Sequence, residues 1–227
     1  MRTAPARGLL LDIGGVILRN GAELVRRRAR RHPRVAELVA RLDLGGPDDE
    51  LWQSMLRREV SERDYWAERA VLIGDAFGKR SWVTTDLIRW LYHGPDDDWL
   101  NDEVIQLMLD VKGAGFPLAA LTNDLVAFHG QEWVDRQAWL KHFDVIVDAS
   151  VSGVFKPDPR AYATATELMG LPAGEVVYLD DMPWNVDGGA AAGLQAIEVR
   201  YDDRDQAVAE ARARLGLAVW PPDRPTM

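Results

Sequence analysis

The chain has 227 residues, of which 47% are hydrophobic, and its 36 acidic against 27 basic side chains give a net charge of −9. This length allows one substantial core, or a core with a smaller inserted domain. The negative charge argues against a nucleic-acid or anionic-membrane partner, so we expect small molecules or proteins instead. Cysteine is absent, which excludes disulfides, thiolate metal sites and a cysteine nucleophile.

Five short apolar runs bounded by turn residues predict the buried strands of a parallel sheet. In chain order they are 8–11, 116–121, 145–147, 176–179 and 196–199. The apolar stretch that contains the first run, 8–18, is interrupted by Asp12 and a Gly-Gly pair. Because it is too short to span a bilayer and lacks a small-residue cleavage signature, we interpret it as a buried strand and expect a cytoplasmic protein.

Residues 20–94 interrupt this series, because they contain helix-like stretches and no convincing strand run. Ser61 and Asp64 match a capping box ahead of a helical stretch at 65–73. We therefore predict a helical insertion at 20–94 and a core formed by 1–19 and 95–227, with the return to the core marked by Pro95 and the acidic residues 96–98. The proline-rich segment 220–227 predicts an irregular tail.

Helical patterns lie between the remaining strand runs. Asn101 is a candidate cap for a helix with one apolar face, formed by Val104, Leu107, Met108 and Val111. Asp158 followed by Pro159 predicts the start of another helix, which Gly170 should end, and Gly193 and Gly216 close two more. Strands that alternate with helices predict a doubly wound, Rossmann-like α/β core, in which ligands bind beyond the carboxyl ends of the strands.

Three acidic residues follow predicted strands directly: Asp12 after the first, and the pair Asp180 and Asp181 after the fourth. Carboxylates crowded at buried strand ends repel one another, so such a cluster generally needs a cation. Oxygen ligands of this kind suit Mg²⁺. The alternative is that each acid only caps the helix that follows it.

Two further segments carry groups that could hold a transferring phosphoryl group. Thr122 and Asn123 follow the second predicted strand, and Lys156 lies in a proline-containing loop after the third. A hydroxyl and an ammonium can neutralise the nonbridging oxygens of a phosphoryl group. Taken singly, Thr-Asn is typical of a turn and a lone lysine is typical of a solvated surface.

Taken in order, four segments resemble the four motifs of the haloacid dehalogenase-like superfamily. They are Asp12-Ile13-Gly14-Gly15-Val16, Leu121-Thr122-Asn123, Lys156-Pro157-Asp158-Pro159 and Leu179-Asp180-Asp181-Met182-Pro183-Trp184-Asn185. The resemblance covers residues 7–199, and the insertion is similar to the helical cap of that family in position and helical character. Within the family, these motifs belong to hydrolases with a Rossmann-like core.

The resemblance implies a magnesium-dependent phosphohydrolase that acts on a small phosphorylated metabolite. Asp12 would attack phosphorus in line to give an aspartyl-phosphate, which water then hydrolyses. Mg²⁺ would be held by the Asp12 carboxylate, the backbone carbonyl of Gly14 and Asp181, with Asp180 either a direct ligand or a support for the ligands.

The resemblance also assigns roles to four residues outside the acidic cluster. Thr122 and Lys156 would bind the phosphoryl oxygens, and Lys156 would also restrain the nucleophile. Asn123 would contribute through its backbone N–H, and Asn185 would orient the loop that carries the acidic pair.

Gly14 departs from the pattern of most phosphatases in this family, which carry a second Asp there as general acid and base. Loss of such a group typically removes about 10²–10⁴ in rate, so we expect modest turnover that favours leaving groups needing little protonation. Two alternatives remain open. One is a 2-haloacid dehalogenase, a class that also lacks this acid but works without Mg²⁺. The other is a weakly active or non-catalytic binding protein.

Overall fold

The computed structural model describes residues 5–94 and 99–218. The chain divides into two compact units, Met1–Arg19 with Leu100–Met227, and Asn20–Trp99. The predicted return to the core at residues 95–98 and the predicted tail at 220–227 lie outside the described residues. Among the described helices, none is both long and apolar enough to cross a membrane.

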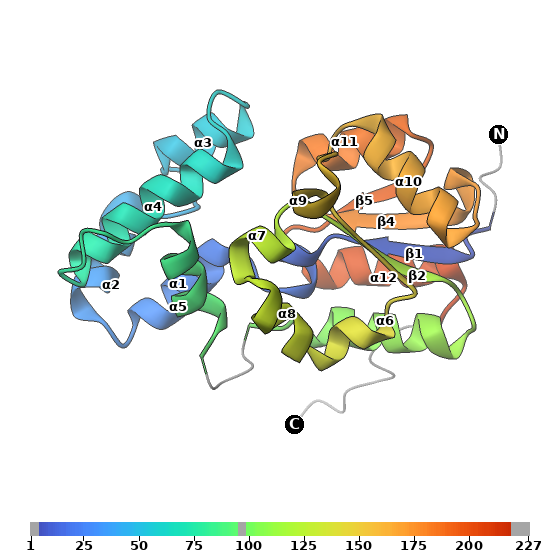
Figure 1. The fold of residues 1–227 in the computed structure, drawn as a ribbon, viewed down its shortest axis with the longest axis horizontal. Helices are drawn as coiled ribbons and strands as arrows, with labels where there is room; N and C mark the ends of the chain where they lie inside the picture. Colours follow the sequence, from blue (N-terminus) through green and yellow to red (C-terminus); the bar gives the residue numbers. More distant parts are fainter. Residues whose placement is uncertain (1–4, 95–98, 219–227) are drawn as a thin grey trace. The chain divides into compact units, whose positions relative to one another are not determined.

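The core of the first unit is a five-stranded parallel sheet in the order β3-β2-β1-β4-β5 (Figure 1). All five predicted strands are confirmed, with ends that differ by two residues at most. Since β1 is central, its carboxyl end lies between those of β2 and β4, and Leu11 pairs with both Ala120 and Leu179. The bounds are β1 Gly8–Leu11, β2 Leu118–Thr122, β3 Val145–Asp148, β4 Val176–Asp180 and β5 Gln195–Glu198.

Helices cover both faces of this sheet, as predicted for a Rossmann-like α/β fold. One face carries α10 (Pro159–Met169) and α11 (Pro183–Ala191), and the other carries α6 (Asp102–Gly113) and α12 (Arg204–Leu215) (Figure 1). Shorter elements join them: η1 Ile13–Ile17, α7 Leu125–His129, α8 Gln131–Arg136, η2 Ala138–His142, α9 Ala149–Ser152 and η3 Ala173–Glu175. The sheet is therefore buried between two helical layers, and its carboxyl edge is where polar side chains can meet.

The predicted helix signals hold for α6 and α10. The buried residues of α6 are the four apolar ones that the pattern placed on one face, and α10 runs from just after Asp158 to just before Gly170, which has a φ of 68°. Asn101 precedes α6 as predicted, but its side chain makes no capping bond. Instead its Nδ2 donates to the carbonyl oxygen of Val16 at 2.5 Å, so the side chain ties α6 to the turn after β1.

The second unit contains five helices in its described part: α1 Gly21–Ala29, α2 Pro33–Leu42, α3 Glu50–Leu56, α4 Glu62–Ala76 and α5 Thr84–Tyr92. Ser61 caps α4 by accepting from the N–H of Asp64 at 3.1 Å. A buried carboxylate, Asp49, joins α3 to α4: it accepts from the Tyr65 hydroxyl at 3.1 Å and from the guanidinium of Arg69. The backbone N–H groups of Gly45 and Trp52 also donate to it, so this buried charge is fully hydrogen-bonded.

Candidate active site

Three carboxylates from two neighbouring strands converge at the carboxyl edge of the sheet. Asp12 follows β1, Asp180 ends β4 and Asp181 comes next, and one oxygen from each lies within 4.8 Å of the others. Parallel strands present their carboxyl ends at one edge, which is why residues 168 positions apart in sequence meet here. Asp12 and Asp180 are buried, and Asp181 is half-buried.

Asp12 caps the turn that follows it and also contacts Lys156. Its Oδ1 accepts from the backbone N–H of Ile13 at 2.6 Å, so the carboxylate does cap the following turn. The same oxygen lies 3.0 Å from the Lys156 Nζ. Burial raises the pKa of the Asp12 carboxyl to about 8, against the opposing effect of the Lys156 ammonium. A capping role alone therefore does not describe Asp12, because its side chain also contacts the buried Lys156 ammonium.

Two carboxylates hold the side chain of Lys156, and Asn123 holds its backbone. Its Nζ lies 2.5 Å from Asp180 Oδ2 as well as 3.0 Å from Asp12 Oδ1, and these neighbours raise the pKa of the ammonium although burial opposes them. The side chain of Asn123 clamps the Lys156 backbone, accepting from its N–H at 2.9 Å and donating to its carbonyl at 3.3 Å. The sequence had pointed only to the backbone of Asn123, so this side-chain contact is an addition to the predicted site.

Asp180 receives donors on both oxygens. Oδ1 accepts from the N–H of Met182 at 2.9 Å and from the amide of Asn185 at 3.1 Å. Oδ2 accepts from Lys156 Nζ and from the hydroxyl of Tyr178. Sequence reasoning missed Tyr178, although a signal existed: residues two apart on a strand share a face of the sheet, so a tyrosine at this position points the same way as Asp180.

The remaining predicted residues border this cluster. Thr122 ends β2, the strand beside β1, and is buried. Asn185, near the start of α11, is buried, and its carbonyl oxygen accepts from the hydroxyl of Tyr162 at 2.8 Å. The structure thus joins Asp12, Lys156, Asp180 and Asn185 by direct contacts, and Asn123 joins through the backbone of Lys156.

The two glycines after Asp12 differ in what surrounds them. Gly14 has a φ of −66° and ψ of 137°, and a Cβ built there would meet nothing within 4 Å. Gly15 has a φ of 69°, and a Cβ there would lie 1.9 Å from Asp181 Oδ2. Only glycine lets the Asp181 carboxylate occupy its position, because any side chain at residue 15 would fill the same space.

Gly15→Ala should therefore displace Asp181 and, with Mg²⁺ bound at this cluster as the sequence predicts, weaken that binding by about 10–100-fold, the range seen when supports of metal ligands are removed. Calorimetric titration with Mg²⁺ measures this directly. Gly170→Ala is the matched control, since Gly170 has a φ of 68° and open space around its Cβ position. The control carries the same backbone strain without the collision, so equal Mg²⁺ affinities in the two variants would contradict the proposed importance of Gly15.

The charge of the cluster fits a divalent cation. The cluster has a net charge of −2 when its three carboxylates and one ammonium are all ionised; these belong to Asp12, Asp180, Asp181 and Lys156. Uncompensated charge of this size is costly at a buried strand edge. Carboxylate and carbonyl oxygens are the ligands that Mg²⁺ takes in proteins. The donor set is therefore suited to Mg²⁺, with Asp12, Asp181 and the Gly14 carbonyl as the predicted ligands and Asp180 as a further ligand or a support for them.

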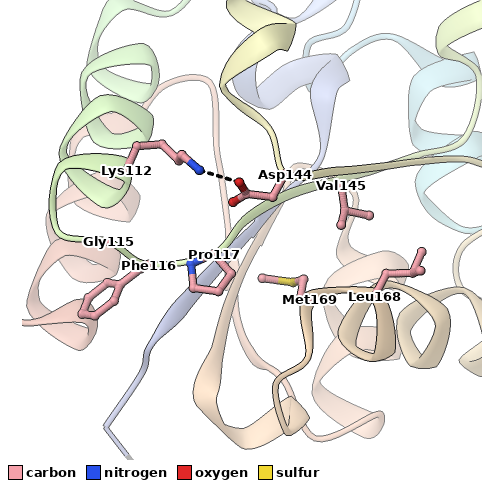
Figure 2. A pocket seen from close by; sticks show the side chains of 8 residues that line it. All are labelled: Lys112, Gly115, Phe116, Pro117, Asp144, Val145, Leu168 and Met169. Atoms are coloured by element: carbon pink, nitrogen blue, oxygen red, sulfur yellow. Dashed lines mark hydrogen bonds and ion pairs between the residues drawn. The ribbon is translucent and has the colours of Figure 1, made fainter.

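A cavity of about 330 Å³ lies at the opposite edge of the same sheet, where β2 and β3 begin (Figure 2). Apolar side chains that include Leu168 and Met169 line it, and an ion pair of 2.5 Å joins Lys112 to Asp144 beside it. Ligands of open α/β sheets bind beyond the carboxyl ends of the strands. This cavity is consequently separate from the carboxylate cluster. Substitutions in its lysine–aspartate pair can therefore serve as controls for substitutions in the cluster.

Similarity to known proteins extends over most of the chain. The mouse protein acyl-CoA dehydrogenase family member 10 is 25% identical over 215 residues, which are 93% of this chain and 19% of that protein. The (S)-2-haloacid dehalogenase 4A of Burkholderia cepacia is 22% identical and aligns with 86% of this chain and 80% of its own length. A crystal structure of a HAD phosphatase from Thermococcus onnurineus is 18% identical, with a TM-score of 0.59, and covers 94% of this chain and 99% of its own.

The chain spans about a fifth of the length of the mouse relative, and the likeness to the Thermococcus onnurineus structure concerns the fold. A family model described as haloacid dehalogenase-like hydrolase matches residues 6–193, which include all four predicted motifs. That match agrees with the parallel five-stranded sheet and with the carboxylates at its edge. The chain belongs to the haloacid dehalogenase-like hydrolase family.

Proposed function

We propose that this hydrolase is a magnesium-dependent phosphohydrolase that acts on a small phosphorylated metabolite through an aspartyl-phosphate. The observation that carries the proposal is the buried contact of Asp12 with Lys156, within a cluster of three carboxylates that suits a divalent cation. A carboxylate nucleophile, a fixed ammonium and a cation site are the parts that phosphoryl transfer requires.

In this proposal a carboxylate oxygen of Asp12 forms a bond to phosphorus while the bond from phosphorus to the leaving oxygen breaks. Water then attacks phosphorus, the bond to Asp12 breaks, and inorganic phosphate leaves. Lys156, held between Asp12 and Asp180, restrains the nucleophile and offsets charge on the phosphoryl oxygens, which Thr122 also binds. Bound Mg²⁺ would supply further neutralisation of those oxygens.

Gly14 bears on the class of substrate. Without an acid two residues after the nucleophile, the leaving oxygen must take its proton from solvent or depart unprotonated. We therefore propose substrates whose leaving groups need little protonation, such as acyl phosphates, aryl phosphates or sugar-1-phosphates.

A dehalogenase is the second candidate, favoured by the similarity to the Burkholderia cepacia enzyme and by the glycine at position 14. Against it stand Asp180 and Asp181, because two acids close to Asp12 would repel the carboxylate of a 2-haloacid. A binding protein with little turnover is the third candidate, since the fold alone does not specify an activity.

The deciding experiment measures phosphate release from p-nitrophenyl phosphate, acetyl phosphate and a panel of sugar phosphates, in Mg²⁺ and in EDTA. Turnover that requires Mg²⁺ and falls steeply as the leaving-group pKa rises is the expected result. Chloride release from 2-chloropropionate in EDTA would instead support the dehalogenase. Folded protein with neither activity would support the binding protein.

A further inference from the structure

Asp180 has no free acceptor position in this structure. An ionised carboxylate offers about four lone-pair sites, and Asp180 receives donors from Lys156, Tyr178, Met182 and Asn185. The residue is fully buried. A cation could bind Asp180 directly only if one of these donors were displaced, whereas Asp181 is half-buried and lies beside Gly15.

The Tyr178 hydroxyl donates to Asp180 from within the core of the sheet. Tyr178 is fully buried on β4, two residues before Asp180 and on the same face of the sheet. Its ring packs edge-to-face against Tyr162, with 5.6 Å between the ring centroids. The ring also packs closely against α11, where a Cβ on Gly189 would lie 2.5 Å from it. These contacts fix the ring, so the hydroxyl has a defined direction toward the carboxylate.

We propose that Tyr178 is a positioning residue of the active site: its hydroxyl shares Asp180 Oδ2 with Lys156, limits the attraction of that carboxylate for the ammonium, and so keeps the ammonium in contact with Asp12. The proposal rests on the phosphohydrolase function proposed above. It assigns the cation to Asp12 and Asp181, and it makes Asp180 a support for the lysine.

Removing the Tyr178 hydroxyl should move the Lys156 ammonium toward Asp180 and away from Asp12. In Tyr178→Phe, Asp180 Oδ2 keeps a single donor, so it attracts the Lys156 ammonium more strongly. The ammonium already lies closer to Asp180 than to Asp12, at 2.5 Å against 3.0 Å. A further move toward Asp180 weakens its hold on the nucleophile, which affects the chemical step more than the binding of substrate.

The test compares Tyr178→Phe with Tyr65→Phe. Both substitutions remove a buried tyrosine hydroxyl that donates to a buried carboxylate with a cationic partner, but Tyr65 serves Asp49 and Arg69 in the helical unit. With p-nitrophenyl phosphate and Mg²⁺, Tyr178→Phe should lower kcat about tenfold, less than the roughly 10²–10³-fold loss when a catalytic donor is removed, because Lys156 is shifted but still present. KM should stay within about twofold, and Tyr65→Phe should keep the wild-type kcat.

Titration calorimetry with Mg²⁺ gives a readout that does not depend on turnover. If the Lys156 ammonium takes up the acceptor position that the hydroxyl leaves on Asp180, as proposed, Tyr178→Phe binds Mg²⁺ within about twofold of the wild-type affinity. If Asp180 is itself a ligand that the hydroxyl restrains, the variant binds Mg²⁺ more tightly, and the proposal is overturned. Unchanged kcat in Tyr178→Phe overturns it as well.

Two further comparisons separate this proposal from other failures. In an Asp180→Asn background, Tyr178→Phe should lower kcat by less than about twofold, because the hydroxyl acts through Asp180; an equal loss in both backgrounds would indicate a damaged core and overturn the proposal. If the wild-type protein binds Mg²⁺ but shows no phosphatase activity, the proposed function fails. The Mg²⁺ affinity of Tyr178→Phe then decides the assignment of Asp180 by itself.

Discussion

Asp12→Asn should abolish phosphate release, lowering kcat by about 10⁴-fold or more, as is typical when a catalytic nucleophile is removed. The amide keeps the shape of the carboxylate but is a poor nucleophile, and it cannot form the ion pair of 3.0 Å with Lys156. Phosphate release in the presence of Mg²⁺ measures the effect. The loss should be the same for every substrate, because both steps of the proposed reaction pass through this residue.

Asp144→Asn is the matched control for this substitution. Asp144 also pairs with a lysine, Lys112, and also accepts from a backbone N–H, that of Leu118 at 2.9 Å. It lies at the amino end of β3, beside the cavity at the opposite edge of the sheet (Figure 2). Asp144→Asn should keep wild-type turnover within about twofold. Activity of Asp12→Asn near that of the control would contradict the role of Asp12 as nucleophile.

Asp12 should also affect how the free energy of unfolding depends on pH when Mg²⁺ is removed. Burial raises the pKa of Asp12 from 3.8 to about 8 in the folded protein. Between these values the folded state holds a proton that the unfolded state has lost, so the free energy of unfolding falls as pH rises. Asp12→Asn removes this contribution. Urea unfolding in EDTA at pH 5 and pH 8 should therefore show a smaller pH dependence in the variant than in the wild type.

The arrangement of the sheet was predictable because its signals are local. Each buried strand is a short apolar run, and an acid at the end of such a run lies at the carboxyl edge of a parallel sheet. Asp12, Asp180 and Asp181 could therefore be placed together before their distances were known. Helix ends were equally predictable where a capping residue and a glycine mark them, as at Asp158 and Gly170.

The contacts that fix the site could not be predicted from the sequence, because they depend on the directions of side chains that are far apart along the chain. Asn123 holds the backbone of Lys156 through its side chain, 33 residues away. The choice of Asp180 as the nearer partner of Lys156 follows from loop geometry that no local pattern encodes. Asn101 stands at a helix-cap position, but its side-chain amide donates to the carbonyl oxygen of Val16, 85 residues away. Local sequence patterns thus locate polar groups more reliably than they identify their partners.

Under the proposed phosphohydrolase function, Gly14→Asp should raise turnover of substrates with poor leaving groups. The backbone at Gly14, with φ of −66° and ψ of 137°, suits any L-residue, and a Cβ there meets nothing within 4 Å. An aspartate at this position could protonate the departing oxygen and later activate water. Sugar phosphates with alkyl leaving groups should gain about 10²-fold or more in kcat, within the usual range for a general acid or base.

Substrates that need no proton provide the internal comparison for this variant. Rates with p-nitrophenyl phosphate and acetyl phosphate should change by less than about threefold, so the dependence of rate on leaving-group pKa should become flatter. Gly14→Asn is the matched control, because it adds the same volume without a transferable proton. Equal gains in the Asp and Asn variants would mean that the added side chain acts through shape. A gain confined to Asp and to poor leaving groups would show that the glycine at position 14 limits the substrate range of this hydrolase.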